Sequence, residues 1–197
     1  MENDQALRPI REAAIDRYWD TFIVDALIAN FDRHIGNWAY IYHSDTGQTT
    51  LAPVYDCGST LYPSLNEQGM QEIAEDPMEK ARRVYQFPTA ALLYKGVKVS
   101  YRDMIRSGLD ERCTAALRRI SERIDLGKIN AIIDHTLVIG EIRKRFYKDM
   151  IAYRKAVIVD NSLQILAHGY DEAARERVEK RIPFNSELFE RMYKEKY

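Results

Sequence analysis

Three polar side chains in the first third of the chain have types and spacing that suit phosphate chemistry. Asp32 and Asn37 are five residues apart in the segment NFDRHIGN, and Asp56 follows in the segment YDCG. Phosphoryl transfer needs an acidic group near the incoming hydroxyl and oxygen ligands that hold Mg²⁺ against the phosphates. Mg²⁺ prefers carboxylate and amide oxygens to nitrogen or sulfur. An Asp, an Asn and a second Asp satisfy both needs.

The residues between Asn37 and Asp56 are expected to bring these side chains together. Aromatic and apolar residues dominate both arms of the segment 38–55, and Ser-Asp-Thr-Gly between the arms is typical of a turn. This pattern predicts a β-hairpin whose two open ends carry Asn37 and Asp56. Pro53 in the second arm predicts an edge strand or a bulge, because proline cannot donate to the ladder.

Either motif alone would be weak evidence. A lone Asp-Arg-His on a loop is more often a cap or an ion pair than a catalytic group, and an Asp-x-Gly can be an ordinary turn. In protein kinases, however, the catalytic Asp is followed five positions later by a metal-binding Asn, and a downstream Asp-x-Gly holds metal. This chain has that order and that spacing, with Asp56 beginning the Asp-x-Gly. For Arg33, a salt bridge that stiffens the loop is at least as good an interpretation as a catalytic role.

The segments LIANFDRHIGNW and LAPVYDCGSTL, within residues 20–61, resemble the catalytic core of the HipA-like serine/threonine kinases. The Asp-Arg-His-x-x-Asn pattern is also similar to that of phosphatidylinositol kinases, but the segment LAPVYD (51–56) favours the HipA-like family. The resemblance implies transfer of the ATP γ-phosphate to a protein hydroxyl, with ATP and Mg²⁺ as cofactors. It also implies a mainly α fold, a helical kinase C-terminal lobe with a small β-hairpin that carries the metal-binding Asp.

The resemblance assigns roles to five residues of this sequence. Asp32 is the implied catalytic aspartate, which orients or deprotonates the substrate hydroxyl. Asn37 and Asp56 are the implied Mg²⁺ ligands, with Asp56 bridging the metal to the β- and γ-phosphates. His34, with the backbone as far as Asn37, is implied to lie beside the nucleotide phosphates. Tyr55 is implied to flank the nucleotide.

The sequence departs from a whole kinase upstream of Asp32. Kinases place a glycine-rich loop and a phosphate-binding lysine before the catalytic Asp. Here the first glycine is Gly36 and the first lysine is Lys80. We therefore expect the N-terminal lobe to be absent, which leaves a fragment, a split kinase with a separately encoded N-terminal lobe, or a degenerate relative. We expect little or no kinase activity from the isolated chain.

Other function classes stay open beside the protein kinase. One is a non-catalytic, partner-binding pseudokinase module in a toxin-antitoxin-like system, with an antitoxin-like protein as its partner. A second is a fragment of a lipid kinase of the phosphatidylinositol type. A metal-dependent phosphohydrolase is disfavoured, since such sites usually have several His ligands or a dense carboxylate cluster and the chain has four His in all.

The remaining sequence predicts mostly helices. Apolar residues at helical spacing predict a helix that begins near Pro9 and ends near Asn30. Asp110 is a candidate cap for another helix, and an apolar stripe from Ile142 predicts a helix or helix pair that ends near Gly169. A last short helix is predicted after proline 183. The whole chain, 1–197, is then one C-terminal lobe with a catalytic loop (30–38), the hairpin (38–55), an irregular stretch like an activation segment (56–88) and a helical remainder (100–197).

Composition excludes some classes of protein. The formal net charge is −1, so the basic excess of a general nucleic-acid binder is missing. The chain has two cysteines, too few for a disulfide framework. The polar N-terminus has no apolar signal segment, and no stretch approaches ~18 apolar residues, so no membrane span is expected. We expect a cytoplasmic protein.

Overall fold

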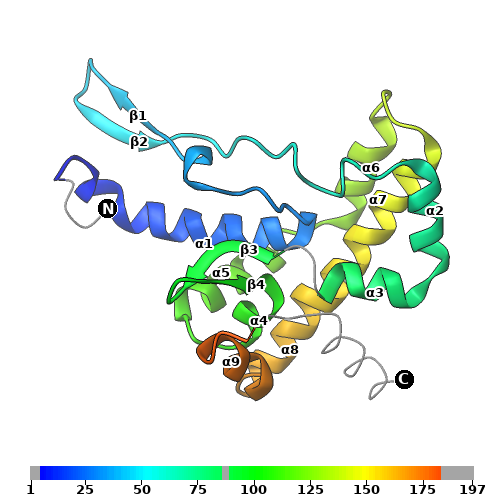
Figure 1. The fold of residues 1–197 in the computed structure, drawn as a ribbon. Coiled ribbons are helices and arrows are strands. Elements are labelled where there is room, and N and C mark those ends of the chain that lie inside the picture. The colour runs from blue at the N-terminus through cyan, green and yellow to red at the C-terminus, as the bar shows by residue number, and fades with distance from the viewer. Residues whose placement is uncertain (1–4, 86–88, 183–197) are drawn as a thin grey trace.

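A long helix, α1 (Arg11–Ile28), runs from one end of the molecule to its centre (Figure 1). The computed structural model describes residues 5–85 and 89–182. A short 3-10 helix, η1 (Gln5–Ile10), precedes α1, so Pro9 lies just ahead of the helix rather than within it. Ala29, in the left-handed region at φ 55°, ends α1 and confirms the predicted end near Asn30.

The described part of the chain is mainly helical with two small antiparallel hairpins, which confirms the predicted fold class (Figure 1). After α1 the elements are η2 (Ile35–Asn37), β1 (Tyr40–His43), β2 (Gln48–Leu51), α2 (Glu67–Glu75), α3 (Pro77–Tyr85), β3 (Thr89–Tyr94), β4 (Val97–Ser100), α4 (Tyr101–Arg106), α5 (Glu111–Ser121), α6 (Leu126–His135), α7 (Glu141–Arg154), the π-helical η3 (Lys155–Asp160), α8 (Asn161–Ala167) and α9 (Glu172–Glu179).

The predicted hairpin is present as β1 and β2, which pair with Tyr40 opposite Leu51 and His43 opposite Gln48. The ladder is shorter than expected and stops before Pro53. The proline is therefore neither in an edge strand nor in a bulge, as the sequence had suggested, but in the chain that leaves the hairpin. Its missing N–H costs nothing outside the ladder.

The stretch predicted as irregular, 56–88, contains two helices instead. Asn66 caps α2 by accepting a hydrogen bond from the Gly69 amide, and Pro77 is the first residue of α3. Proline is well tolerated at that first helical position, because the N–H it lacks would have no partner there. Asn66 and Pro77, within the stretch predicted as irregular, are thus helix-start signals. The second hairpin, β3 and β4, was not predicted.

The C-terminal half follows the predicted helices more closely. The Asp110 side chain accepts hydrogen bonds from the amides of Arg112 and Cys113, so it caps α5 as expected. The predicted stripe from Ile142 occupies α7, η3 and α8, which end before Gly169. The helix predicted after proline 183 lies outside the described residues. Within the described ranges, no helix is long and apolar enough to cross a membrane.

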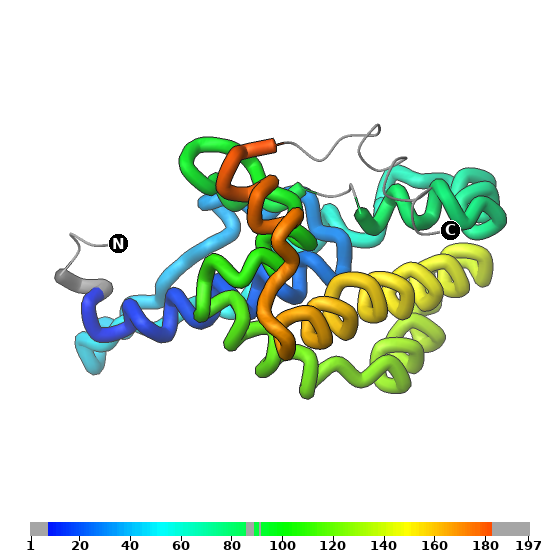
Figure 2. Tube along the Cα trace, turned by 90° about the horizontal axis from the view of Figure 1, so that it is seen from below, coloured from blue at the N-terminus to red at the C-terminus, as the bar shows by residue number. Residues whose placement is uncertain are grey.

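The core forms where α1 meets α4, α5 and α7, and its fully buried members include Ile23, Leu117 and Met150. In both views of the backbone the β1–β2 hairpin and the group of α2, α6 and α7 lie at opposite ends of the molecule (Figures 1 and 2). The loop between α1 and β1, which carries the predicted catalytic residues, begins at the central end of α1. It is therefore attached directly to the core.

Candidate active site

The loop between α1 and β1 is anchored by the carboxylate of Asp25, near the end of α1. Arg33 donates to it through Nε at 2.9 Å and Nη2 at 3.1 Å, and Asn30 Nδ2 donates at 2.9 Å. The side chains of Arg33 and Asp25 are 7% and 2% exposed. The hydrogen bond to Asp25 raises the pKa of Arg33 above its ordinary value. Arg33 is thus a charged, buried part of the scaffold, in line with the salt-bridge interpretation.

The same guanidinium also holds the chain that follows the β1–β2 hairpin. Arg33 Nη1 donates to the backbone carbonyl of Tyr55 at 2.7 Å, and Nη2 lies 3.5 Å from Cys57 Sγ. These contacts fall on either side of Asp56. One side chain therefore fixes the catalytic loop and the Asp-x-Gly segment relative to α1.

Asn37 and Asp56 meet directly. Asn37 Nδ2 donates to Asp56 Oδ2 at 2.5 Å, and Asn37 Oδ1 accepts a hydrogen bond from the His34 amide at 2.9 Å. The Tyr55 hydroxyl donates to the Gly36 carbonyl at 2.9 Å. The structure thus brings together His34, Asn37, Tyr55 and Asp56, which the sequence placed in one site.

The imidazole of His34 has a structural task in this loop. Its Nδ1 accepts a hydrogen bond from the Gly36 amide at 3.1 Å and caps the short η2 turn. A Cβ on residue 36 would lie 2.9 Å from His34 Cε1, closer than side-chain carbons pack. Glycine at position 36 therefore lets the backbone approach the imidazole.

Asp32 stands apart from this network. Its side chain is exposed, and its amide donates to Asn30 Oδ1 at 3.2 Å. Within the described part of the chain, the Asp32 carboxylate has no hydrogen-bond or ion-pair partner. A carboxylate that is held by its backbone and open to solvent can reach the hydroxyl of an incoming substrate.

Asp56 and Asn37 fit the requirements of a Mg²⁺ site. Asp56 has a left-handed backbone (φ 57°), a conformation that Asp tolerates better than most residues, and its side chain is exposed. Its Oδ2 faces Asn37, whereas Oδ1 accepts no hydrogen bond from the residues described. The amide oxygen of Asn37 keeps a second lone pair beyond the one used by His34. Such a pair suits Mg²⁺, which usually takes few protein ligands and completes its shell with phosphate and water.

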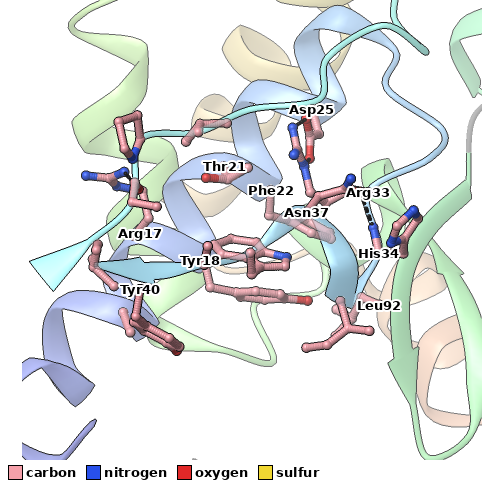
Figure 3. A pocket seen from close by; sticks show the side chains of 18 of the residues that line it. Arg17, Tyr18, Thr21, Phe22, Asp25, Arg33, His34, Asn37, Tyr40 and Leu92 are labelled. Carbon is pink, nitrogen blue, oxygen red and sulfur yellow. Dashed lines mark hydrogen bonds and ion pairs between the residues drawn. The ribbon is translucent and has the colours of Figure 1, made fainter. Parts of the chain in front are cut away.

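A pocket of about 450 Å³ lies between α1, the catalytic loop and the β1–β2 hairpin (Figure 3). Arg17 and Tyr40 are at one end of it, and Arg33 and His34 at the other. Its lining is mainly apolar and aromatic: Ala14, Arg17, Tyr18, Thr21, Phe22, Asp25, Arg33, His34, Ile35, Asn37, Trp38, Ala39, Tyr40, Leu51, Ala52, Pro53, Val54, Leu92 and Tyr101. Of the predicted site residues, His34 and Asn37 line the pocket, whereas Asp32, Tyr55 and Asp56 do not, so the pocket adjoins the polar site from one side.

Sequence reasoning missed Asp25 and Asn30, which anchor the loop between α1 and β1 to the core. Asn30 is fully buried, and its carbonyl accepts a hydrogen bond from the Tyr101 hydroxyl of α4 at 3.1 Å. One signal was available for Asp25, since it lies on the buried face of an amphipathic helix. A carboxylate at such a position must find partners, because an unpaired buried charge is costly.

The chain is similar in sequence and in fold to known proteins. Residues 4–125 match the family model described as the HipA-like C-terminal domain. The serine/threonine-protein kinase CtkA of Helicobacter pylori is 39% identical over 144 residues, which are 73% of this chain and 44% of that protein. The crystal structure of a Helicobacter pylori proinflammatory kinase CtkA is similar with a TM-score of 0.78 at 34% identity, over 85% of this chain and 61% of that one. The chain thus spans less than half the length of that curated relative.

Proposed function

Because this chain belongs to the HipA-like C-terminal domain family, we propose that residues 1–197 are the catalytic lobe of an ATP-dependent serine/threonine protein kinase. The name of the Helicobacter pylori relative supports a protein hydroxyl over a lipid hydroxyl as the acceptor. The chemistry would be transfer of the ATP γ-phosphate with Mg²⁺.

One observation carries the proposal, the hydrogen bond of 2.5 Å between Asn37 and Asp56. It joins the catalytic loop to the segment after the hairpin, so that the Asn37 amide and the Asp56 carboxylate lie side by side. We propose that these two side chains hold Mg²⁺, with Asp56 directed toward the β- and γ-phosphates. When bound, Mg²⁺ neutralises the charge of the phosphates. The Arg33 contacts to Asp25 and to the Tyr55 carbonyl support this geometry, because they fix the positions of the two segments relative to each other.

Asp32 is the proposed catalytic base. Its exposed carboxylate would orient the hydroxyl of a serine or threonine and accept its proton as the phosphoryl group moves. His34 and the backbone up to Asn37 would lie along the phosphates, with the imidazole acting mainly through the turn that it caps. Tyr55, whose hydroxyl is already bound to the Gly36 carbonyl, would flank the nucleotide.

The isolated 197 residues should be a poor catalyst. Residues 1–31 contain neither a lysine nor a glycine, so these residues supply neither the usual phosphate-binding lysine nor the glycine-rich loop. We expect turnover far below the ~1–100 s⁻¹ typical of kinases. A second polypeptide segment, such as a separately encoded N-terminal lobe, would supply those groups and raise the rate.

The proposal is tested by phosphate transfer at millimolar Mg-ATP, measured with γ-labelled ATP over long incubations. Slow incorporation of label should fall about 100-fold or more in Asp32→Asn, since a positioned base contributes at least that much. The matched control is Asp45→Asn, in the exposed turn of the hairpin. Equal incorporation by the wild-type chain and Asp32→Asn would contradict the assigned role.

A second candidate is a non-catalytic module that binds a protein partner. It is favoured by apolar side chains left exposed around the catalytic loop, where Ile35 is 85% and Val54 46% exposed. A chain that binds no Mg-nucleotide, but is captured tightly by one defined partner through this surface, would favour the module over the kinase. Loss of that capture in Ile35→Asp would place the partner on the loop.

A further inference from the structure

The pocket between α1, the catalytic loop and the β1–β2 hairpin is built on one face of α1. Side chains that are three or four positions apart point the same way from a helix. Those of α1 that line the pocket follow this repeat: Ala14, Arg17, Tyr18, Thr21, Phe22 and Asp25. The volume of about 450 Å³ lies within the ~300–1,000 Å³ of most small-molecule sites. The size of the pocket and its place on a core helix therefore suit a bound small molecule.

Aromatic rings form much of the pocket wall. Tyr18 stacks on Trp38 with the ring centres 5.7 Å apart, and the ring centres of Phe22 and Tyr101 are 4.8 Å apart. Leu92 of β3 adds aliphatic surface from a second hairpin (Figure 3). An apolar ligand body would be stabilised between these walls, because its surface would leave water for an apolar surround.

The hydroxyl of Thr21 is a polar group without a partner in this mainly apolar lining. Thr21 is 4% exposed, and its hydroxyl forms no hydrogen bond with any residue of the described ranges. Buried polar groups normally have a hydrogen-bond partner, so this exception calls for a water molecule or a ligand atom in the pocket. Thr21 lies next to Arg17 along the pocket, so the charge of Arg17 bears on which ligand that is (Figure 3).

Arg17 gives this end of the pocket a positive charge. It is half-buried and forms no ion pair with the described residues, and its printed contact, from Nη1 to the Ala52 carbonyl, is a long hydrogen bond of 3.5 Å. At the other end of the pocket, the Asp25 carboxylate is already bound to Arg33. Within the described part of the chain, Arg17 is therefore left as an unbalanced positive charge in the lining.

We propose that this pocket binds a small monocarboxylic acid with an apolar, aromatic body. Arg17 presents paired N–H donors that match a carboxylate, and the Thr21 hydroxyl, one helical turn away, can donate to the same group. One cation and one hydroxyl suit a monoanion better than a phosphate group, whose charge is about −1.5 to −2 at pH 7. The body of the acid would extend from Arg17 between the rings of Phe22 and Trp38.

The position of the charge distinguishes this ligand from a nucleotide. Arg17 lies at the end of the pocket away from Arg33 and His34, and Asp56 does not line the pocket at all (Figure 3). A nucleotide carries its negative charge on the phosphates, which the proposed Mg²⁺ site would hold, so its uncharged base would leave Arg17 without a counter-ion. The inference needs neither Mg²⁺ nor phosphoryl transfer, so it does not depend on the proposed kinase activity.

The experiment compares phenylpropionate with its neutral analogue phenylpropionamide. Binding is measured by isothermal titration, by thermal denaturation and by tryptophan fluorescence, since Trp38 lines the pocket. Phenylpropionate should bind the wild-type chain and raise its melting temperature. The amide should bind about tenfold or more weakly, because it cannot form charged hydrogen bonds with Arg17. Equal binding of the acid and the amide, or no binding of the acid, would overturn the proposal.

Two substitutions locate the binding. Arg17→Gln should weaken the binding of phenylpropionate about tenfold or more but leave that of the amide nearly unchanged, because only the acid needs the positive charge. Thr21→Val, which keeps the shape of the side chain and removes the hydroxyl, should weaken the acid's binding to a smaller extent. Arg123→Gln, at an exposed position outside the pocket, is the matched control. Binding of the acid to Arg17→Gln as tightly as to the wild-type chain would contradict the proposal.

Adenosine tests the alternative of a nucleoside in the same pocket. We expect it not to displace phenylpropionate from the wild-type chain. Displacement by adenosine, together with weaker adenosine binding in Thr21→Val, would assign the pocket to a nucleoside and overturn the proposal.

Discussion

The buried carboxylate of Asp25 accepts hydrogen bonds from two nitrogen atoms of Arg33, Nε at 2.9 Å and Nη2 at 3.1 Å. The third nitrogen of the guanidinium, Nη1, reaches the Tyr55 carbonyl at 2.7 Å. Helix α1 thereby controls both the loop with Asp32 and the segment with Asp56. A buried ion pair adds little net stability, but it strongly favours the one arrangement that satisfies it.

Removal of one member of this pair should be costly. We expect Asp25→Ala to lower the free energy of unfolding by about 3–5 kcal/mol, because Arg33 would be left as an uncompensated buried charge. The double variant Asp25→Ala/Arg33→Met should recover much of that loss. Urea denaturation of the variants measures the effect. The exposed pair of Arg112 and Glu12 is the control, and Glu12→Ala should leave the free energy of unfolding close to that of the wild-type chain.

The close approach at Gly36 makes a second prediction. Gly36→Ala would press a methyl group against the His34 ring and should destabilise the loop by about 1–3 kcal/mol. Because His34 and Asn37 share that turn, affinity for Mg-nucleotide should fall as well. Gly58→Ala is the matched control nearby, since a Cβ there meets nothing within 4 Å. Equal stability and affinity in the two variants, by denaturation and titration, would show that the turn tolerates the methyl group.

The two thiols should differ in reactivity. Cys57 is exposed, whereas Cys113 is buried and its burial raises the pKa of the thiol. Iodoacetamide should therefore modify Cys57 in the folded chain and Cys113 only after unfolding, as mass spectrometry can show. Since Cys57 directly follows Asp56, Mg-ATP should slow its modification. Modification of Cys57 at the same rate with and without Mg-ATP would argue against nucleotide at this segment.

Stability should fall at alkaline pH. Burial raises the pKa of Tyr18 to about 12, and burial also raises the pKa of Tyr62 and Tyr101. Between the ordinary tyrosine pKa near ~10 and these raised values, the unfolded chain loses protons that the folded chain keeps, so unfolding becomes easier as pH rises. Urea midpoints measured from pH 9 to 11.5 should decline, and less steeply in Tyr18→Phe. Tyr42→Phe, which removes an exposed phenol, should leave the slope unchanged.

Local patterns in the sequence were enough to predict the hairpin and most helices. The turn at Ser-Asp-Thr-Gly and the aromatic and apolar residues on both sides of it predicted β1 and β2, and the cap at Asp110 predicted the start of α5. Proline and glycine were more ambiguous signals, because they occur both in loops and at helix ends. Pro77, for example, is the first residue of a helix in a stretch that was predicted to be irregular. The β3–β4 hairpin was missed although its turn leaves a local signal, since Lys95 and Gly96, both with positive φ, join Tyr94 directly to Val97.

In the candidate site, too, some features could be predicted from the sequence and others could not. Spacing and a family resemblance brought Asn37 and Asp56 together, and the structure joins them by a hydrogen bond. The contact between Asp25 and Arg33 spans eight residues around a helix end, and Arg33 reaches Tyr55 across the hairpin. Such contacts depend on the fold as a whole. A buried acidic residue in an amphipathic helix was the one hint that the sequence offered.

Isothermal titration of Mg-ATP into the 197-residue chain is the most direct test of the proposed site. We predict weak binding that disappears when Mg²⁺ is chelated, and that falls about tenfold or more in Asp56→Asn, because a carboxylate ligand to the metal is lost. Asp45→Asn, in the exposed hairpin turn, should bind as the wild-type chain does. Binding that persists without Mg²⁺, or that is unchanged in Asp56→Asn, would contradict a metal-nucleotide site at Asn37 and Asp56.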